Sequence, residues 1–191
     1  MNTSRDRSLK ARLLLSLAWL LVGFTGGNAA ANKPQMTIQS EDNALEITLK
    51  VTVPYSREDV WKLIRDYENL SQYMPNVDSS VVVARTDSSQ LVRQVVTTRV
   101  LLPWTFRLQF EFVQDAEERL RFRMLEGNLR SYEGSWQVEA LEDSSSITYW
   151  ARVTHRLPLP NFLLRYVVHM QMSQMMPALV VELDRQAETG P

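Results

Sequence analysis

Alternation of apolar and polar residues dominates the middle of the chain. It begins in the segment Ala44 to Val53, where every second residue is apolar, a spacing typical of a strand with one buried face. From Val77 onward the same period of two continues through six further predicted strands: Val77–Arg85, Gln90–Leu102, Thr105–Gln114, Arg119–Glu126, Arg130–Leu141 and Ser146–His155. Short turn-like links join these six segments, which predicts an antiparallel meander.

Two short helices are predicted between the first strand and the meander. Pro54 ends the strand, and Ser56 can cap a following helix, with Asp59 as its partner three residues on. The buried face of that helix is formed by Val60, Trp61, Leu63 and Ile64. A second short helix is predicted over Tyr67 to Met74.

A long helix is predicted at the end of the chain, from Pro160 to Glu188, with Asn161 as its N-cap. Apolar residues occur on more than one side of it, so most of its surface has to be covered. Four of the eight methionines fall within seven of its residues: Met170, Met172, Met175 and Met176. Flexible methionine side chains provide an adaptable apolar lining.

These elements predict an α+β fold in which a seven-stranded, curved antiparallel sheet surrounds the C-terminal helix. The two short helices are too small to cover seven strands, so the long helix has to lie against the concave, apolar face. Gly134, on that inner face, suits a strong bend in the sheet. Where helix and sheet diverge we expect an apolar cavity, which is the candidate binding site.

The first 31 residues have the features of a secretory signal peptide. Basic residues precede a short apolar run, Leu13 to Phe24, and small residues follow up to Ala31. We expect cleavage near Ala31, with Ala29 and retention as an uncleaved anchor as alternatives, and a periplasmic or secreted product. Residues 32–43 are predicted to form a flexible leader and residues 44–188 the ligand-binding domain.

Composition narrows the range of partners. Removal of residues 1–31 takes away four basic side chains and one acidic one, so the remainder has a net charge of about −4. A nucleic-acid-binding face needs an excess of basic residues, so nucleic acid is not an expected partner. The chain contains no cysteine, which excludes disulfides and thiolate chemistry. We expect a monomer.

Three segments resemble the helix-grip superfamily of START-like, birch-pollen-allergen-like and polyketide cyclase/dehydrase proteins. They are VTVPYSREDVWKLIRDYENLSQYMPNV, LRFRMLEGNLRSYEGSWQVEAL and HRLPLPNFLLRYVV. The resemblance covers roughly residues 44–187 and is nearest to the bacterial coenzyme Q-binding-type cyclase group. It implies a pocket for a lipid, an isoprenoid such as a quinone, a polyketide or a similar apolar molecule.

Nine residues are predicted to line this pocket, most of them aromatic side chains on inward faces or residues of the C-terminal helix. They are Tyr73, Phe110, Phe122, Tyr132, Trp136, Tyr149, Tyr166, Met170 and Gln174. Tyr166 and Gln174, together with His169, are expected to orient the polar end of a ligand.

Residues with catalytic or metal-binding chemistry are few. Both histidines, His155 and His169, can face the cavity, but no third metal ligand is evident, so neither a metal nor a cofactor is expected. Arg99 and Arg130 are either outward and exposed or inward and able to hold an anionic or carbonyl group. Glu126 and Glu133 are best explained as surface residues.

The sequence favours an exported binding or carrier protein for a hydrophobic small molecule. One alternative is a cyclase- or dehydratase-like enzyme with His169 or Tyr132 as acid or base. Another is an interaction module in which Trp104, at the tip of a predicted hairpin, contacts a partner protein or transiently a membrane. The same tip can instead fold back over the mouth of the cavity.

Overall fold

The computed structural model describes residues 33–41, 43–100, 103–155 and 160–190. The predicted signal peptide, residues 1–31, lies outside the described residues, as do the last two residues of the predicted strand Gln90–Leu102. The elements follow one another in the order β1 Gln35–Glu41, β2 Ala44–Val53, α1 Arg57–Ile64, α2 Leu70–Tyr73, β3 Val77–Arg85, β4 Ser89–Thr98, β5 Trp104–Ala116, β6 Arg119–Gly127, β7 Ser131–Ala140, β8 Ser145–Thr154 and α3 Asn161–Thr189.

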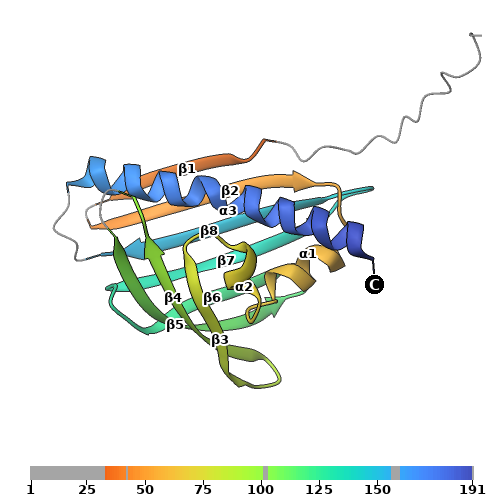
Figure 1. Cartoon of the computed structure of the whole chain (residues 1–191), viewed down its shortest axis with the longest axis horizontal. Coiled ribbons are helices and arrows are strands. Elements are labelled where there is room, and N and C mark those ends of the chain that lie inside the picture. Colours follow the sequence, from red (N-terminus) through yellow and green to blue (C-terminus); the bar gives the residue numbers. More distant parts are fainter. Residues whose placement is uncertain (1–32, 42, 101–102, 156–159, 191) are drawn as a thin grey trace, which may run out of the picture.

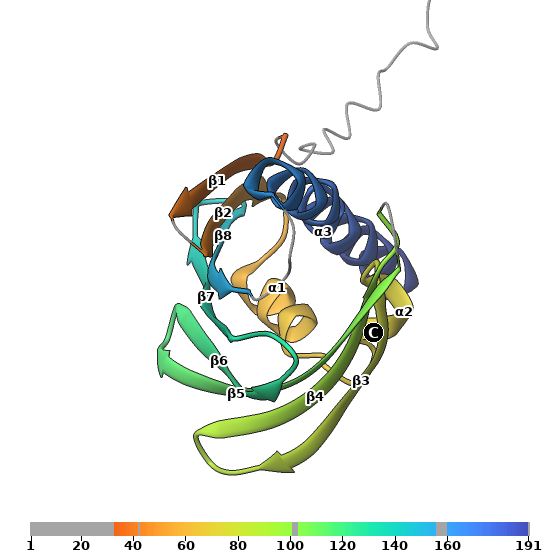
Figure 2. The same ribbon diagram turned by 90° about the vertical axis from the view of Figure 1, so that its left-hand side faces the viewer.

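One antiparallel sheet of eight strands forms the frame, in the order β1-β2-β8-β7-β6-β5-β4-β3. The predicted meander, β3 to β8, is therefore confirmed, and β2 joins it by pairing with β8. Figure 2 shows the sheet curling around the interior, with α3 lying along its open side and α1 within the curve. The predicted α+β fold is confirmed (Figure 1).

The prediction of seven strands is wrong, because the segment expected to be a flexible leader contains β1. It pairs with β2 in the register Met36↔Leu49 and Ile38↔Ile47, along the free edge of that strand. Met36 and Ile38 are its two apolar residues, and both are half-buried. The other residues of the strand are exposed. An edge strand with so few apolar residues is stabilised by its backbone pairing with β2, and alternation gives little signal for it.

Strand β2 has the bounds that its alternation predicts, and its apolar side chains form the centre of the core. Leu45, Ile47, Leu49, Val51 and Val53 are all nearly inaccessible to solvent. Opposite them on β8 lie Tyr149 and Ile147, in the register Leu49↔Tyr149 and Val51↔Ile147. These two strands thus build the solid part of the inner face.

Gly134 is required where β6, β7 and β8 meet. It lies opposite Phe122 on β6 and Ala151 on β8. A Cβ atom here would lie 2.3 Å from the Trp150 carbonyl oxygen and 2.5 Å from Cζ of Phe122. No side chain fits at that distance, so glycine permits the close packing that accompanies the bend.

The two short helices form where expected. Ser56 caps α1: its Oγ accepts a hydrogen bond from the Asp59 amide at 3.1 Å and donates one to the Asp59 carboxylate at 2.7 Å. Helix α2 is shorter than predicted and covers only Leu70–Tyr73. Asn76 follows it with φ of 67°, a conformation that asparagine tolerates better than most residues.

Helix α3 is continuous through Pro177. Pro160 occupies the N-cap position, so Asn161 is the first helical residue and not the cap. Along its C-terminal half, Met176, Leu179 and Leu183 are almost fully buried. Of the helices within the described residues, none is long and apolar enough to cross a membrane.

Candidate ligand-binding cavity

A cavity of about 350 Å³ lies between the concave face of the sheet and the N-terminal half of α3. Its walls come from β2, α1, α2, β3 to β8 and α3, so nearly every element of the fold contributes to it. The C-terminal half of α3 packs into the core, as the buried Met176 and Leu183 show. The cavity is therefore formed where α3 separates from the sheet.

Aromatic rings form the inner end of the cavity. They come from alternate positions of β5 to β8, which the two-residue period of a strand places on one face. Phe122 lies at the centre, with its ring 5.7 Å from Phe110, 5.6 Å from Tyr132 and 5.9 Å from Tyr149. Trp136 contacts Tyr149 at 4.7 Å between ring centres. These tilted and edge-to-face contacts give the inner end a rigid apolar wall.

One part of the cavity is bordered by the β4–β5 hairpin, the β6–β7 link and the start of α3, and we call it the mouth. It is formed by lining residues whose side chains are only half-buried: Val100, Trp104, Leu129, Leu163 and Val167. They belong to the β4–β5 hairpin, the β6–β7 link and the first two turns of α3. A molecule entering between these segments would meet apolar side chains throughout.

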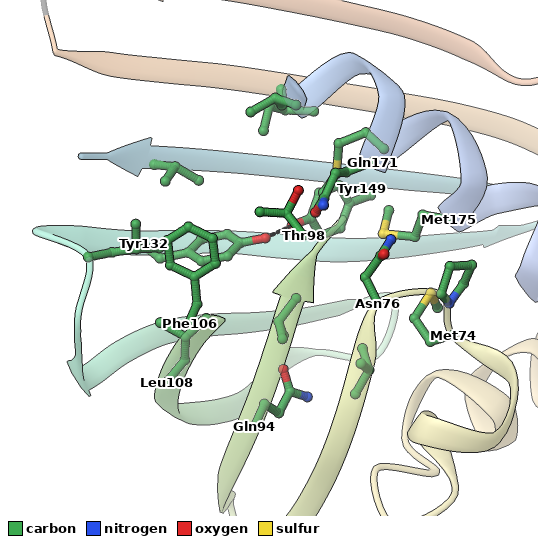
Figure 3. Close-up of a pocket in the computed structure, with 18 of the residues that line it drawn as sticks. Met74, Asn76, Gln94, Thr98, Phe106, Leu108, Tyr132, Tyr149, Gln171 and Met175 are labelled. Carbon is green, nitrogen blue, oxygen red and sulfur yellow. Dashed lines mark hydrogen bonds between the residues drawn. The ribbon is translucent and has the colours of Figure 1, made fainter. Parts of the chain in front are cut away.

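Two tyrosines form a hydrogen-bonded pair inside the cavity. The hydroxyls of Tyr132 and Tyr149 lie 2.6 Å apart (Figure 3). Burial raises the pKa of Tyr132, and it raises the pKa of Tyr149 well above its ordinary value. Both side chains are therefore neutral hydrogen-bonding groups at physiological pH.

Four uncharged polar side chains complete the lining: Asn76, Gln94, Thr98 and Gln171. Figure 3 shows them projecting into the cavity from α3, β4 and the segment before β3. Gln94 donates a long hydrogen bond to Ser80 at 3.4 Å, and Thr98 Oγ1 accepts one from the Val100 amide at 3.4 Å. Nε2 of Gln171 is buried and has no hydrogen-bond partner among the described residues.

No side chain that the structure describes in the lining carries a permanent charge. Among the described residues, no Asp, Glu, Lys or Arg lines the cavity, and His155 near the mouth is its only imidazole. The charged residues of the sheet lie instead on its outer face, as the Arg123–Glu111 ion pair at 2.7 Å illustrates. The described part of the chain contains no cluster of side chains that could hold a metal ion.

The sequence matches a family model described as polyketide cyclase / dehydrase and lipid transport, over residues 53–180. This covers more than half of the chain. The protein belongs to this polyketide cyclase/dehydrase family. The matched region begins at the end of β2 and ends within α3, so it includes most of the segments that build the cavity.

Several solved structures of other proteins share the fold. A protein from Thermus thermophilus is 27% identical, with a TM-score of 0.62 over 73% of this chain and 94% of that chain. The Zhui aromatase/cyclase from Streptomyces sp. R1128 is 16% identical, with a TM-score of 0.66 over 78% and 99%. A STAR-related lipid transfer protein from Xanthomonas axonopodis is 17% identical, with a TM-score of 0.61 over 81% and 100%. A search of curated proteins finds no match.

In this polyketide cyclase/dehydrase-family domain, five of the nine predicted pocket residues lie in the cavity lining: Phe110, Phe122, Tyr132, Trp136 and Tyr149. All five come from strands, where the inward face can be deduced from alternation. The structure thus brings together the strand residues that the sequence singles out.

The other four predicted residues lie outside the cavity lining. Tyr73, the last residue of α2, donates a hydrogen bond to the Leu63 carbonyl of α1 at 3.1 Å. Tyr166 is 51% exposed on the outer side of α3, Gln174 is also exposed, and Met170 does not reach the cavity. The cavity side of the helix is formed instead by Leu164, Val168, Gln171 and Met175.

The predicted and the observed cavity-facing sides of α3 differ by a rotation about the helix axis. One residue of an α-helix corresponds to about 100°, so choosing Met170 in place of Gln171 selects the wrong side of the helix. Apolar residues occur around most of its circumference, and hydrophobicity alone therefore gives no single inward face. Two glutamines on the helix, Gln171 and Gln174, are distinguished only by the packing.

Of the remaining candidate residues with ionisable side chains, one lies in the cavity lining and the others lie on the surface. His155 is buried in the lining, whereas His169 is exposed on the outer side of α3 beside β1. Arg99 is exposed and pairs with Asp78 at 2.8 Å, and Arg130 is exposed as well. The glutamates Glu126 and Glu133 lie on the surface. The outward alternative is thus correct for both arginines.

Proposed function

We propose that the protein is an exported binding or carrier protein for a hydrophobic small molecule of the lipid, isoprenoid or polyketide type. The observation that carries the proposal is the cavity itself: about 350 Å³ of space, lined almost wholly by aliphatic and aromatic side chains. An empty space of this size in a well-packed domain lowers stability, because its walls lose contacts. An apolar ligand would restore those contacts.

Burial of the ligand's apolar surface supplies the affinity in this proposal. Each Å² removed from water contributes about 25 cal/mol before the losses of ligand freedom are subtracted. The adaptable part of the wall, Met74, Met172 and Met175, can adjust to ligands of different shape. The rigid aromatic end would fix the position of the deepest part of the ligand.

Two further observations support the proposal. The family description includes lipid transport, and the structure from Xanthomonas axonopodis is of a STAR-related lipid transfer protein. Export is supported by the basic, apolar and small-residue segments of residues 1–31. An exported carrier would meet its ligand at or near a membrane.

Binding is favoured over catalysis by the positions of the candidate acid and base groups. His169 is on the outer side of α3, outside the cavity. Tyr132 is inside, and burial raises its pKa, so at neutral pH it is protonated; this disfavours a role as general base and leaves only that of a hydrogen-bond donor or a weak acid. What the cavity offers most clearly is an enclosed apolar surface.

Native mass spectrometry of the protein purified from the periplasm, followed by lipid extraction, tests the proposal. We expect a co-purifying apolar mass. The variant Met172→Trp should fill the cavity and abolish that mass, whereas Gln174→Trp places the same side chain on the exposed side of the same helix and should retain it.

Absence of a bound mass, combined with no binding of a neutral fluorescent apolar probe by the purified protein, would overturn the proposal. Equal loss of the ligand in both tryptophan variants would also count against it, because the effect would then not depend on the cavity. Turnover of the extracted molecule during incubation would indicate the enzymatic alternative.

A further inference from the structure

We propose that the ligand is uncharged and carries an oxygen of the carbonyl type, which accepts hydrogen bonds from Gln171, Thr98 and the Tyr132–Tyr149 pair. The inference rests on the proposed binding function and specifies which class of hydrophobic molecule the cavity selects. A ketone, a quinone and an ester carry such an oxygen. A pure hydrocarbon lacks it, and a fatty-acid anion carries a charge.

The first donor is the side-chain amide of Gln171. Its Nε2 is buried and unpartnered among the described residues, and it lies on the cavity side of α3. A buried N–H group without an acceptor is unfavourable, and such groups are rare in folded proteins. The amide of a solvent-facing residue would gain this partner from water, as the exposed Gln174 can. Gln171 instead lines the cavity, so an acceptor held there could pair with this group once the side-chain amide turns toward it.

The second donor is the tyrosine pair. In a hydrogen bond between two hydroxyls, one hydrogen lies between the oxygens and the other stays available. Since the Tyr132 and Tyr149 hydroxyls are 2.6 Å apart and no other bond is found for either among the described residues, one O–H remains for a ligand. The high pKa values of both side chains keep that hydrogen in place.

The third donor is Thr98, at the end of β4. Its Oγ1 accepts a long hydrogen bond from the Val100 amide, and within the described residues its own hydrogen has no acceptor. Thr98 is 5% exposed, so bulk water does not easily supply one. Figure 3 shows Thr98, Gln171 and the tyrosine hydroxyls projecting into the same part of the cavity. Three donor groups, from α3, β4 and the β7–β8 pair, therefore belong to the lining of one cavity.

The absence of charge from the lining selects against ionised ligands. A buried carboxylate requires a paired cation, and no Lys or Arg among the described residues lines the cavity. An ammonium group would lack a carboxylate in the same way. His155 lies near the mouth and is already engaged in an interaction with a neighbour. Neutral donors without a counter-charge fit an uncharged acceptor oxygen.

A matched series of ligands tests this inference. Tetradecane, the methyl ketone of equal chain length and tetradecanoate would each compete with a neutral fluorescent apolar probe bound to the mature protein at neutral pH. We expect the ketone to compete roughly tenfold better than the alkane and better than the carboxylate, the size of effect that one well-formed hydrogen bond supplies.

Substitutions of the donor side chains identify which of them cause the preference for the ketone over the alkane. Gln171→Leu keeps the side-chain volume but removes the donor, so it should reduce the ketone's advantage over the alkane to about twofold or less. Gln174→Leu, on the exposed side of the same helix, should leave that advantage unchanged. If Gln171→Leu fails to fold, Thr98→Val and the double variant Tyr132→Phe/Tyr149→Phe remove the other donors and should each lower the same ratio.

The possible failures can be told apart. Equal competition by the three ligands, or stronger competition by the carboxylate, would overturn this inference and leave the binding function intact. No competition by any of them would overturn the binding function itself. An unchanged ketone preference in all three donor variants would show that the oxygen is bound elsewhere.

Discussion

Tyr132 and Tyr149 form their hydrogen bond diagonally across two neighbouring strands. Tyr132 pairs with Val153 in the β7–β8 register, and Tyr149 pairs with Trp136, so the tyrosines lie on opposite sides of the Gly134–Ala151 pair. Because glycine and alanine occupy the position between them, the two long side chains reach over it, and their hydroxyls come to 2.6 Å. The small pair that permits the bend thus also permits the polar contact.

Removal of one hydroxyl should destabilise the protein modestly. We expect Tyr149→Phe to lower the free energy of unfolding by about 1 kcal/mol, because Tyr132 loses its partner inside an apolar cavity. The double variant Tyr132→Phe/Tyr149→Phe should be destabilised by less than the two single changes added together. Urea unfolding of all four proteins gives the coupling directly. Simple additivity would mean that the hydroxyls do not interact in solution.

The same pair predicts a dependence of stability on alkaline pH. Burial raises the pKa of both tyrosines in the folded state above the ordinary value of about 10 that applies in the unfolded chain. Their contribution to stability is therefore fully present below about pH 10 and is lost as the pH rises further, since only the unfolded state ionises readily. Urea unfolding at neutral pH and above pH 10 should show a decrease in unfolding free energy.

The double phenylalanine variant is the control for this pH effect. It should lose less stability between the two pH values than the natural protein, and Tyr55, Tyr67 and Tyr73, whose pKa values are also raised by burial, contribute to the remainder. Identical losses in both proteins would assign the effect to other groups.

Much of the fold can be predicted from the sequence because most strands have one solvent-exposed face and one buried face. The bounds of β2 follow directly from alternation, those of β3 agree with the predicted segment, and a serine cap marks the start of α1. Strand β1 cannot be predicted in this way. Its inward residues, Met36 and Ile38, give too short a pattern, and its position is set by pairing with the distant edge of β2.

The prediction of the cavity lining likewise succeeds for the strands and fails for helix α3. On strands, an inward direction at one position fixes the next but one, so Phe110, Phe122 and Tyr149 could be assigned to the cavity. On α3 the apolar residues surround the axis, and the sequence therefore does not distinguish Gln171 from Gln174. The unpartnered amide of Gln171 becomes visible only when burial is known.

Substitution of Gly134 should be severe. In Gly134→Ala the new methyl group would meet the Trp150 carbonyl oxygen at 2.3 Å and the ring of Phe122 at 2.5 Å. Overpacking of a core ordinarily costs about 1–3 kcal/mol, and contact with backbone places this site at the upper end. The neighbouring change Ser135→Ala, on the other face of β7, should cost little. Thermal unfolding of the two variants makes the comparison, and equal midpoints would contradict the close packing described.

Substitution of Trp104 tests whether its ring covers a ligand at the mouth of the cavity. It begins β5, opposite Thr98, and its half-buried ring lines the cavity. A tip that folds back over the mouth contributes to ligand burial, so Trp104→Ala should weaken binding of a neutral apolar probe by roughly tenfold, about 1.4 kcal/mol. Unfolding midpoints should change little, because the side chain is not part of the buried core.

Leu141 supplies the control for Trp104. It is 49% exposed near the β7–β8 turn and does not line the cavity, so Leu141→Ala should leave probe binding unchanged. Flotation with phospholipid vesicles, carried out on the same variants, addresses the other role of an apolar tip. If Trp104→Ala abolished vesicle association and left probe binding intact, the tip would be a docking surface, because a ring that closes the mouth must affect what the cavity holds.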